Sequence, residues 1–473
     1  MDIFERVVVH MSDFLMTYIV SFLLILTGII YTVRLNFFQI RFFPHVIKNT
    51  LGTIFDKNRK KGTITPFQAF ASGLGTTAGA TNIVGVAVAI ALGGPGALFW
   101  MWMIALIGMI TKYAEIVLGL KYREQNKEGE WVGGAMYYIK KGLGWKPLAS
   151  IFAFFLMLEI LASIMVQSNS IATQLNSAFN VNQMIIGVVI VILVGIIVIG
   201  GIKRVGKITD KLVPFMILAY ILVTITVIIW HIDQLPHVFA LIFKHAFTPM
   251  SATGGFAGST IAGALRWGLA RGLYSNEAGM GTAPFTHSAA QTDHPSKQAI
   301  WGILSVFMDT IVICSLTGFT VLTTNAWKEV SVNKASSMVD VALSTIMGGY
   351  GSLFVSVFLF LFVITTIMVL VFYGEKQVEY LFGLKAAKIS RFVYLISIFI
   401  GAIGGLQLIW KFLDLLLAAV TIVNLVPLIL LNKEVKEITQ DYVDRIIKQV
   451  KGEPTVTLFV EKEKRNNSGI YGK

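Results

Sequence analysis

The chain has 473 residues, of which 55% are hydrophobic and 14% are charged, and its mean hydropathy is +0.73. Because soluble domains carry roughly 25% charged residues, this composition indicates a protein of the lipid bilayer. The single cysteine, Cys314, excludes an intramolecular disulfide framework. The formal net charge of +13 comes from basic residues dispersed over many loops, so it gives no reason to expect a nucleic-acid partner.

Apolar stretches recur along the chain at lengths suited to membrane helices, for which about 20 residues suffice. The first stretch has no basic region before it, so we interpret it as a retained helix and not a signal peptide. A half-apolar stretch at 235–249 is interpreted as interfacial, and residues 435–450 as a surface helix of the tail. The eleven predicted spans are 14–33, 66–91, 96–120, 149–178, 183–200, 212–231, 251–290, 299–323, 349–374, 392–409 and 412–431.

The basic residues predict the orientation of these spans. If the N-terminus lies outside, the segments on the cytoplasmic side hold 31 of the 39 lysines and arginines. This is the asymmetry that the positive-inside rule requires. We therefore predict a multi-pass protein of the cell (plasma or inner) membrane, with a cytoplasmic tail at 432–473. The lipid bilayer is an expected partner, and no obligate protein partner is evident.

The second stretch has an unusual centre. Residues 73–85 are rich in Gly and Thr and contain Asn82, all of which weaken a helix. Backbone groups freed in hydrocarbon must find partners, so irregular backbone survives there only where it lines a protein cavity. One interpretation is a discontinuous helix whose freed amides and carbonyls hold a solute or ion. The alternative is a glycine-rich packing seam between helices.

The seventh stretch, 251–290, has 40 residues, which as a helix would be about 60 Å long, twice the thickness of a bilayer core. We predict a break at 274–281. Within it, Glu277 is expected either to pair with Arg271 or another basic group, or to handle an ion or proton. Glu159, in the fourth span, is interpreted either as a protonated or hydrogen-bonded buried acid or as a functional group.

The two interrupted helices each begin a set of five. Because five is odd, the two sets cross the membrane in opposite directions, which is typical of an inverted-repeat transporter with its site at the bilayer midplane. A channel would need continuous polar rings or filter loops, and an enzyme would need a motif such as HExxH or GxSxG. The sequence has neither feature, so we predict a transporter that is not an enzyme and has no cofactor.

Several motifs resemble those of one family, the sodium:alanine (alanine/glycine:cation) symporters. The most specific is GGPGALFWMW at 93–102; the others are GGAMYY at 133–138, QSNS at 167–170, GGIKR at 200–204, RGLYSNEAG at 271–279 and YGEK at 373–376. The resemblance implies an all-α protein with the 5+5 inverted repeat of the leucine-transporter fold and one extra N-terminal helix. A single transmembrane domain, 1–431, would then comprise the extra helix 14–33, repeat one 66–231 and repeat two 251–431.

The resemblance also implies a sodium site between the second and ninth helices. Oxygen ligands suit a hard cation such as sodium, and the absence of a formal charge allows its release. Two adjacent threonines in a membrane helix are, however, more often hydrogen-bonded to their own helix. The implied ligands are the carbonyls of Gly75, Ala78 and Phe362 and the hydroxyls of Thr365 and Thr366.

An implied substrate site lies beside the sodium. The amides of Gly79, Ala80 and Thr81 would bind a carboxylate, and carbonyls near Thr77 and Ser275 an ammonium. Family members usually have Gly-Thr-Gly-Asn at 79–82 and several have Trp at 370, so the pocket of this chain differs. The full predicted set is Thr77, Gly79, Ala80, Thr81, Asn82, Gln167, Tyr274, Ser275, Asn276, Thr366 and Leu370.

The function implied by the resemblance is secondary active symport. The protein would import a small neutral amino acid such as alanine or glycine together with sodium, by alternating access. The alternative is a transporter of the same fold that is coupled to protons or carries a larger substrate, for example glutamine.

Overall fold

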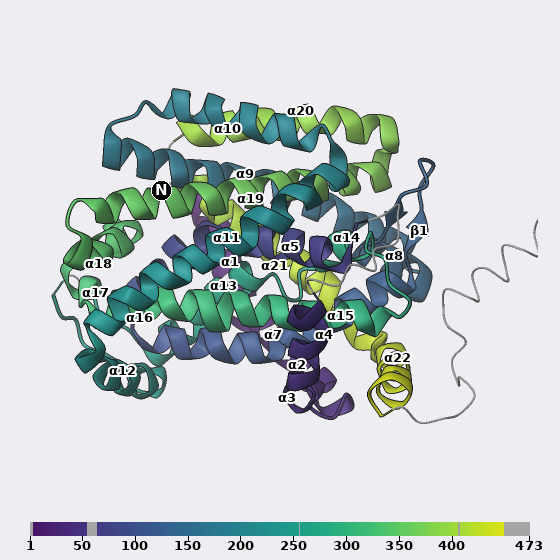
Figure 1. The fold of residues 1–473 in the computed structure, drawn as a ribbon, viewed down its shortest axis with the longest axis horizontal. Coiled ribbons are helices and arrows are strands. Elements are labelled where there is room, and N and C mark those ends of the chain that lie inside the picture. The colour runs from purple at the N-terminus through teal and green to yellow at the C-terminus, as the bar shows by residue number, and fades with distance from the viewer. Residues whose placement is uncertain (1–2, 54–63, 255, 405–406, 449–473) are drawn as a thin grey trace, which may run out of the picture.

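The protein is almost entirely helical in a computed structural model that describes residues 3–53, 64–254, 256–404 and 407–448 (Figure 1). Its one sheet is a hairpin of β1 (Glu124–Gln125) and β2 (Trp131–Val132). The helices before the middle of the chain are α1 (Ile3–Phe14), α2 (Ser21–Arg34), α3 (Phe38–Arg41), α4 (Phe43–Thr50), α5 (Pro66–Thr77), α6 (Val86–Gly93), α7 (Gly96–Lys121), α8 (Ala135–Gly142), α9 (Lys146–Phe179), α10 (Gln183–Val198), α11 (Gly201–Trp230) and α12 (Leu235–Phe247).

The second half of the chain is equally helical. Wider π-helical turns occur at Leu15–Val20, Thr81–Gly85 and Phe307–Cys314. Turns of this kind are rare and are frequent at functional sites. The remaining helices are α13 (Ile261–Asn276), α14 (Ala283–His287), α15 (Pro295–Val306), α16 (Ser315–Thr323), α17 (Ala326–Glu329), α18 (Met338–Met347), α19 (Tyr350–Phe382), α20 (Leu384–Ile403), α21 (Gln407–Leu430) and α22 (Asn432–Tyr442).

Eight described helices are long and apolar enough to cross a membrane, or nine if the bent pair α5–α6 counts as one span. The prediction of eleven membrane-spanning helices is therefore confirmed in part. The stretch 183–200 forms α10, which at 16 residues is shorter than the other spans. The stretch 251–290 forms α13 and α14, separated by irregular backbone. The half-apolar stretch 235–249 forms the helix α12, and its interfacial position stays a prediction. The tail helix predicted at 435–450 is present as α22 and the π-helical turn Val443–Ile447, and residues 449–450 lie outside the described residues.

Several predicted helix ends were wrong by about two turns or more. Residues 201–211, predicted as a loop, are the first turns of α11, and most of 375–391 belongs to α19 and α20. Hydropathy falls where lysine and arginine begin. The backbone stays helical there because long basic side chains reach from a helix end to the polar interface while their stems pack on apolar surface.

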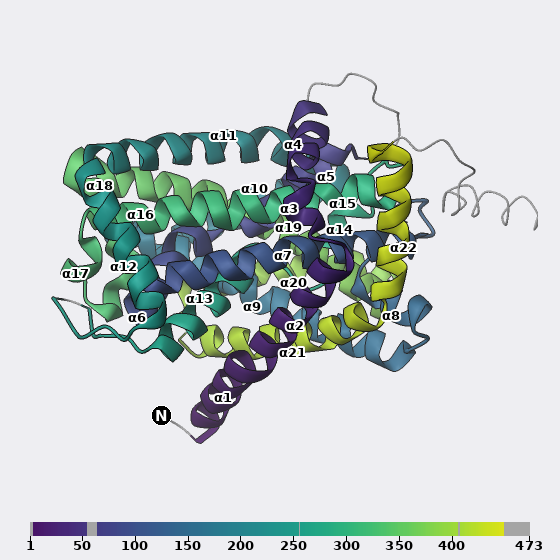
Figure 2. The same ribbon diagram turned by 90° about the horizontal axis from the view of Figure 1, so that it is seen from below.

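The helices pack in layers (Figure 1). Helices α10 and α20 cover α9 and α19 on one side, and α7, α13 and α15 lie on the other. Helices α1 and α2 run along the outside of the bundle, against α21 and α7 (Figure 2). The outer helices expose large apolar side chains, as helices facing lipid do; examples are Ile185, Ile196, Leu222, Phe392 and Ile396.

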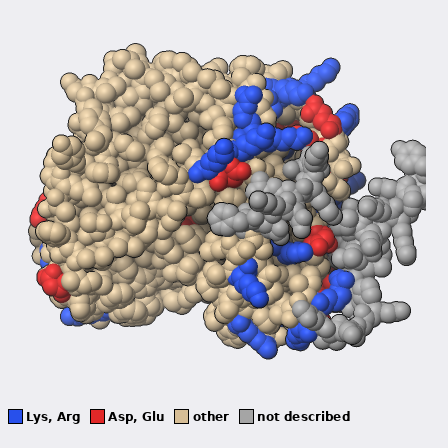
Figure 3. All heavy atoms as spheres, viewed as in Figure 1, with Lys and Arg blue, Asp and Glu red and all other residues tan. Residues whose placement is uncertain are grey.

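Charge is distributed very unevenly over the surface. On the face drawn in Figure 3, lysine and arginine gather mainly at the end that carries α8, α22 and the hairpin, and most of the remaining surface is uncharged. This pattern suits a membrane-embedded body with one basic end.

Close packing of α9 against α20 depends on a glycine. A Cβ at Gly401 would lie 2.5 Å from the Met165 carbonyl oxygen and 2.6 Å from Met165 Cα, which are backbone atoms that cannot easily move. At Gly195 of α10, a Cβ would lie 3.6 Å from Leu395, an ordinary contact. Gly401→Ala is therefore expected to lower the midpoint of thermal unfolding in detergent, because overpacking costs about 1–3 kcal/mol.

Gly195→Ala is the matched control and should leave the midpoint unchanged. Equal midpoints for the two variants would show that α9 and α20 do not approach as closely as described.

Candidate functional site

The second apolar stretch is a broken helix. Helix α5 ends at Thr77, and the chain resumes as the π-helical turn Thr81–Gly85 followed by α6. The two halves are bent by 49° at Ala78–Ala80. This confirms the predicted discontinuity, and the simple packing seam is excluded because the axis changes direction.

Side chains from three helices satisfy the backbone at this first break. The Gly79 amide donates to Asn82 Oδ1 at 2.9 Å, and the Ala80 amide donates to Gln167 Oε1 of α9 at 3.0 Å. The Thr366 hydroxyl of α19 donates to the Gly75 carbonyl at 3.0 Å. Asn82 therefore caps the break, and residues far apart in the sequence replace the missing helical hydrogen bonds.

The second break follows α13, where the prediction placed it. The helix ends at Asn276, and the next residue, Glu277, has a left-handed backbone (φ 55°). Gly279 (φ 96°) and Gly281 (φ 75°) continue the irregular path until α14 begins. Glycine adopts such angles without strain, so Gly279 and Gly281 allow an irregular backbone between α13 and α14.

Two charged residues of α7 hold this second break. Lys112 Nζ donates to the Asn276 carbonyl at 2.8 Å, where a cation also suits the negative end of α13. Glu115 Oε1 accepts from the Gly281 amide at 2.9 Å. Asn424 of α21 donates to the Gly279 carbonyl at 2.9 Å. All three side chains are buried, so the break is stabilised by the protein and not by water.

Asp309 connects the two breaks. It is fully buried in the π-helical turn Phe307–Cys314. Its Oδ1 accepts from Asn82 Nδ2 at 2.7 Å, and its Oδ2 accepts from Ser275 Oγ at 2.6 Å. Asn82 also caps the first break and Ser275 belongs to the last turn of α13, so one carboxylate ties both irregular segments together.

The predicted pairing of Glu277 with Arg271 is wrong. Arg271 lies 3.6 Å from Asp414 of α21, and Glu277 Oε2 accepts from the Thr282 hydroxyl at 2.6 Å. The basic group within electrostatic range of Glu277 is Lys112. The left-handed backbone at Glu277 ends α13 and directs the next residues away from the helix that carries Arg271.

The five predicted sodium ligands meet where α5 contacts α19. Thr366 Oγ1 is 3.0 Å from the Gly75 carbonyl oxygen and 3.4 Å from that of Ala78. Thr365 instead donates to the Phe362 carbonyl of its own helix at 2.8 Å. A Cβ on Gly75 would lie 3.7 Å from Thr365 Cβ, so the two threonines face the same stretch of α5.

The predicted substrate residues surround the two breaks. Tyr274 donates or accepts a hydrogen bond with Ser163 at 2.9 Å, and Asn276 donates to Thr310 at 3.2 Å. Leu370 lies one turn after Thr366 on α19. Thr77 back-bonds to the Leu74 carbonyl at 3.1 Å. Every non-glycine member of the predicted set is buried to 7% exposure or less, so this conformation is shut off from bulk water.

One face of α9 runs past both breaks. Gln167 reaches the Ala80 amide and Ser163 reaches Tyr274, and Glu159 follows at the same four-residue spacing. Glu159 is 2% exposed, and no residue in the described part of the chain donates a hydrogen bond to its carboxyl group. Glu159 is therefore a buried acid, and its interpretation as a protonated or hydrogen-bonded acid or as a functional group stays a prediction.

Three residues of the site were missed from the sequence: Lys112, Glu115 and Asp309. A signal existed, since each is a charged residue inside a predicted span, 96–120 or 299–323. Such residues are functional candidates by default. Only the structure reveals that they converge on the backbone of the two breaks.

Comparison with known proteins identifies the family. Residues 1–456 match the model of the sodium:alanine symporter family. This chain belongs to that family. It is 44% identical to the uncharacterized transporter YflA of Bacillus subtilis, over 98% of this chain and 100% of that protein. It is 40% identical to the sodium/alanine symporter AgcS of Methanococcus maripaludis, over 87% and 91% of the two chains. The family transports amino acids with sodium, so the chain is a transporter and not an enzyme.

Another relative is named after a different substrate. The probable sodium/glutamine symporter GlnT of Bacillus subtilis is 34% identical over 99% of this chain and 96% of its own. Among solved structures, the manganese transporter of Eremococcus coleocola matches with a TM-score of 0.52 and 14% identity, over 84% of this chain and 83% of that one. That likeness shows the fold alone, which is the leucine-transporter type.

Gly79 lies so close to side chains of α9 and α19 that the first break has no room for a larger residue. It has no positive φ. A Cβ there would lie 2.8 Å from Thr366 Oγ1 and 3.0 Å from Gln167 Nε2. Gly79→Ala is expected to displace both partners and to reduce amino-acid uptake in proteoliposomes roughly tenfold or more, as loss of polar contacts worth about 1.5–3 kcal/mol would do.

The control is Gly73→Ala in α5, where a Cβ would meet its nearest neighbour at 3.4 Å. It should transport normally. Uptake by Gly79→Ala at the wild-type rate would contradict the described contact between α5, α9 and α19.

Proposed function

We propose that this protein is a sodium-coupled secondary active symporter that imports a small neutral amino acid, such as alanine or glycine, by alternating access. The observation that carries this proposal is the first break. There the Thr366 hydroxyl of α19 meets the Gly75 carbonyl of α5, and the Gln167 side chain of α9 meets the Ala80 amide of the break. These polar groups lie in the interior of a membrane protein, where only a ligand or a structural partner justifies them.

Sodium is proposed to bind between α5 and α19. The Thr366 hydroxyl already lies within 3.4 Å of the Gly75 and Ala78 carbonyl oxygens along this contact. Thr365 and the Phe362 carbonyl would join them when the Thr365 hydroxyl turns from its own helix. Neutral oxygen dipoles replace part of the hydration shell of sodium and still permit its release.

The substrate carboxylate is proposed to bind the amides of the first break. In this conformation Asn82 and Gln167 accept hydrogen bonds from Gly79 and Ala80. A carboxylate is a stronger acceptor than an amide oxygen and has two oxygens to offer. It would therefore displace these side chains and lie at the positive N-terminal end of the α6 half-helix. The ammonium would lie near the Thr77 and Ser275 carbonyls, where Asp309 adds negative charge.

The substrate side chain is proposed to lie among Thr81, Tyr274 and Leu370. Leucine at 370 leaves more room than tryptophan would, whereas Thr81 takes space that a glycine would leave. The volumes of the side chains at 81 and 370 together therefore set the size of the substrate that fits. Glutamine is the larger substrate that we consider as the alternative. One methylene in such a pocket changes selectivity by about 10- to 200-fold.

The architecture proposed is eleven membrane helices, in two inverted sets of five after one extra helix. The bent pair α5–α6 and the broken pair α13–α14 each begin a set, and α1–α2 precedes both. The extra helix would be 14–33, repeat one 66–231 and repeat two 251–431. The basic end of the molecule would face the cytoplasm, with the N-terminus outside and the tail 432–473 inside.

The sodium site is tested by Thr366→Val, which keeps the shape of the side chain and removes its hydroxyl. The apparent sodium affinity for uptake in proteoliposomes should fall about 10- to 100-fold, because hydrogen bonds to charged groups contribute roughly 1.5–3 kcal/mol. Thr224→Val is the control, since the Thr224 hydroxyl bonds only within α11.

An unchanged sodium dependence in Thr366→Val would exclude Thr366 as a ligand. The same assay with alanine, glycine and glutamine, under a sodium gradient or a proton gradient, separates the proposed function from its alternatives. Uptake driven by protons alone, or uptake of glutamine in preference to alanine and glycine, would overturn it.

A further inference from the structure

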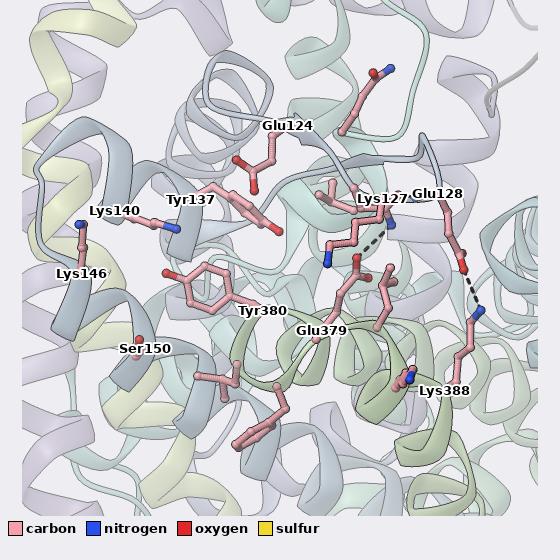
Figure 4. Close-up of a pocket in the computed structure, with 18 residues that line it drawn as sticks. Glu124, Lys127, Glu128, Tyr137, Lys140, Lys146, Ser150, Glu379, Tyr380 and Lys388 are labelled. Atoms are coloured by element: carbon pink, nitrogen blue, oxygen red, sulfur yellow. Dashed lines mark hydrogen bonds and ion pairs between the residues drawn. The ribbon is translucent and has the colours of Figure 1, made fainter.

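A cavity of about 940 Å³ opens at the basic end of the molecule, away from the two helix breaks (Figure 4). Its walls come from four places: the β1–β2 hairpin, α8, the first turns of α9, and the junction of α19 with α20. Lysines reach it from each of these places. We call it the lysine cavity. Its lysines are Lys127, Lys140, Lys146, Lys385 and Lys388.

The acidic residues of the lysine cavity are all neutralised by ion pairs. Glu124 pairs with Lys141 at 2.8 Å, Glu128 with Lys388 at 2.7 Å, and Glu379 with Lys376 at 2.8 Å. The other four lysines that line the cavity have no carboxylate partner within 4 Å in the described part of the chain. The cavity therefore carries an excess of positive charge that no described protein group balances.

The N-terminal ends of two helices add to the positive charge of the lysine cavity. Helix α9 begins at Lys146, and α20 begins at Leu384 directly after Gly383, whose left-handed backbone (φ 84°) turns the chain from α19. Both first turns line the lysine cavity. The N-terminal end of a helix has free amides and a partial positive charge, so both ends favour an anion in the same space as the lysines.

Exposed apolar side chains flank the lining residues of the lysine cavity, and we call them its apolar rim. Phe382, itself a lining residue, is 65% exposed; Ile389, next to Lys388, is 65% exposed; and Trp145, next to Lys146, is 42% exposed. Tryptophan beside lysine at the end of a lipid-facing helix is typical of the membrane interface. A ligand at this place would have its charged group among the lysines and apolar chains beside α20.

The tail of this chain, 449–473, is a poor occupant, because its own lysines and arginine outnumber its acidic residues. A soluble phosphate would meet the lysines and make no use of the apolar rim. An anionic phospholipid satisfies both features.

We propose that the lysine cavity binds the phosphate headgroup of an anionic phospholipid from the leaflet at the basic end of the molecule. Basic pockets between membrane helices recognise such headgroups in other membrane proteins. Lys146 and Lys385, at the starts of α9 and α20, attract the anionic headgroup from two sides of the cavity, and the acyl chains lie along Phe382 and Ile389. The lipid thereby joins the hairpin and α8 to the α19–α20 junction.

The test uses the full-length protein purified in a neutral detergent, titrated with phosphatidylglycerol or with phosphatidylcholine. Bound lipid is counted by native mass spectrometry, and the thermal midpoint is followed in parallel. Phosphatidylglycerol should bind and raise the midpoint, whereas phosphatidylcholine should not. The double variant Lys146→Gln/Lys385→Gln should weaken binding roughly 25-fold, since each lysine near a membrane surface contributes about fivefold.

The control is Lys203→Gln/Lys207→Gln, which removes the same charge from exposed positions of α11 outside the lysine cavity. It should retain phosphatidylglycerol binding. Equal losses in the two double variants, or no loss in either, would overturn the proposal. Inorganic phosphate that raises the midpoint where phosphatidylglycerol does not would assign the cavity to a soluble anion and also overturn it.

Discussion

The structure depends on one constraint: backbone groups released where a membrane helix breaks must be paired inside the protein. Both breaks obey it through side chains brought from distant parts of the chain. Asn82 and Gln167 accept from the amides of the first break, and Lys112 and Glu115 hold the carbonyl and amide of the second. Asp309 then joins the breaks through Asn82 and Ser275. Without these partners, the unpaired backbone groups would make the irregular segments unstable in the hydrocarbon of the membrane.

Because side chains pair the backbone groups at the breaks, the breaks are also suited to bind and release a transported ligand. Hydrogen bonds made by side chains can be exchanged for bonds to a ligand at small net cost, whereas the internal bonds of a helix cannot. Gln167 and Thr366 belong to α9 and α19, while the groups they meet belong to α5 and the residues after it. A ligand bound among them would connect two sets of helices, which is the arrangement that alternating access by movement of one set against the other requires.

The sequence predicted the two breaks, because glycine and small polar residues weaken a helix inside an otherwise apolar span. The resemblance to the family implied that Gly75 and Thr366 meet. The sequence did not predict which partners satisfy the second break. Lys112, Glu115 and Asp309 are brought there by the packing of α7 and of the π-helical turn, and periodicity does not specify such long-range contacts. Helix ends were also misplaced, since hydropathy reports the edge of the membrane and not the end of the helix.

The central claim is that the Asp309 carboxylate holds the two breaks in register, and Asp309→Asn tests it most directly. The variant keeps the size of the side chain but removes its negative charge and one of its two acceptor oxygens, so only one of the hydrogen bonds that Asn82 and Ser275 donate keeps its acceptor. Asp340→Asn is the control, because that carboxylate bonds to Gln174 of α9, away from both breaks. Sodium-dependent uptake should fall roughly tenfold or more for Asp309→Asn at equal yield of folded protein, and remain near wild type for Asp340→Asn. Wild-type uptake by Asp309→Asn would contradict the account.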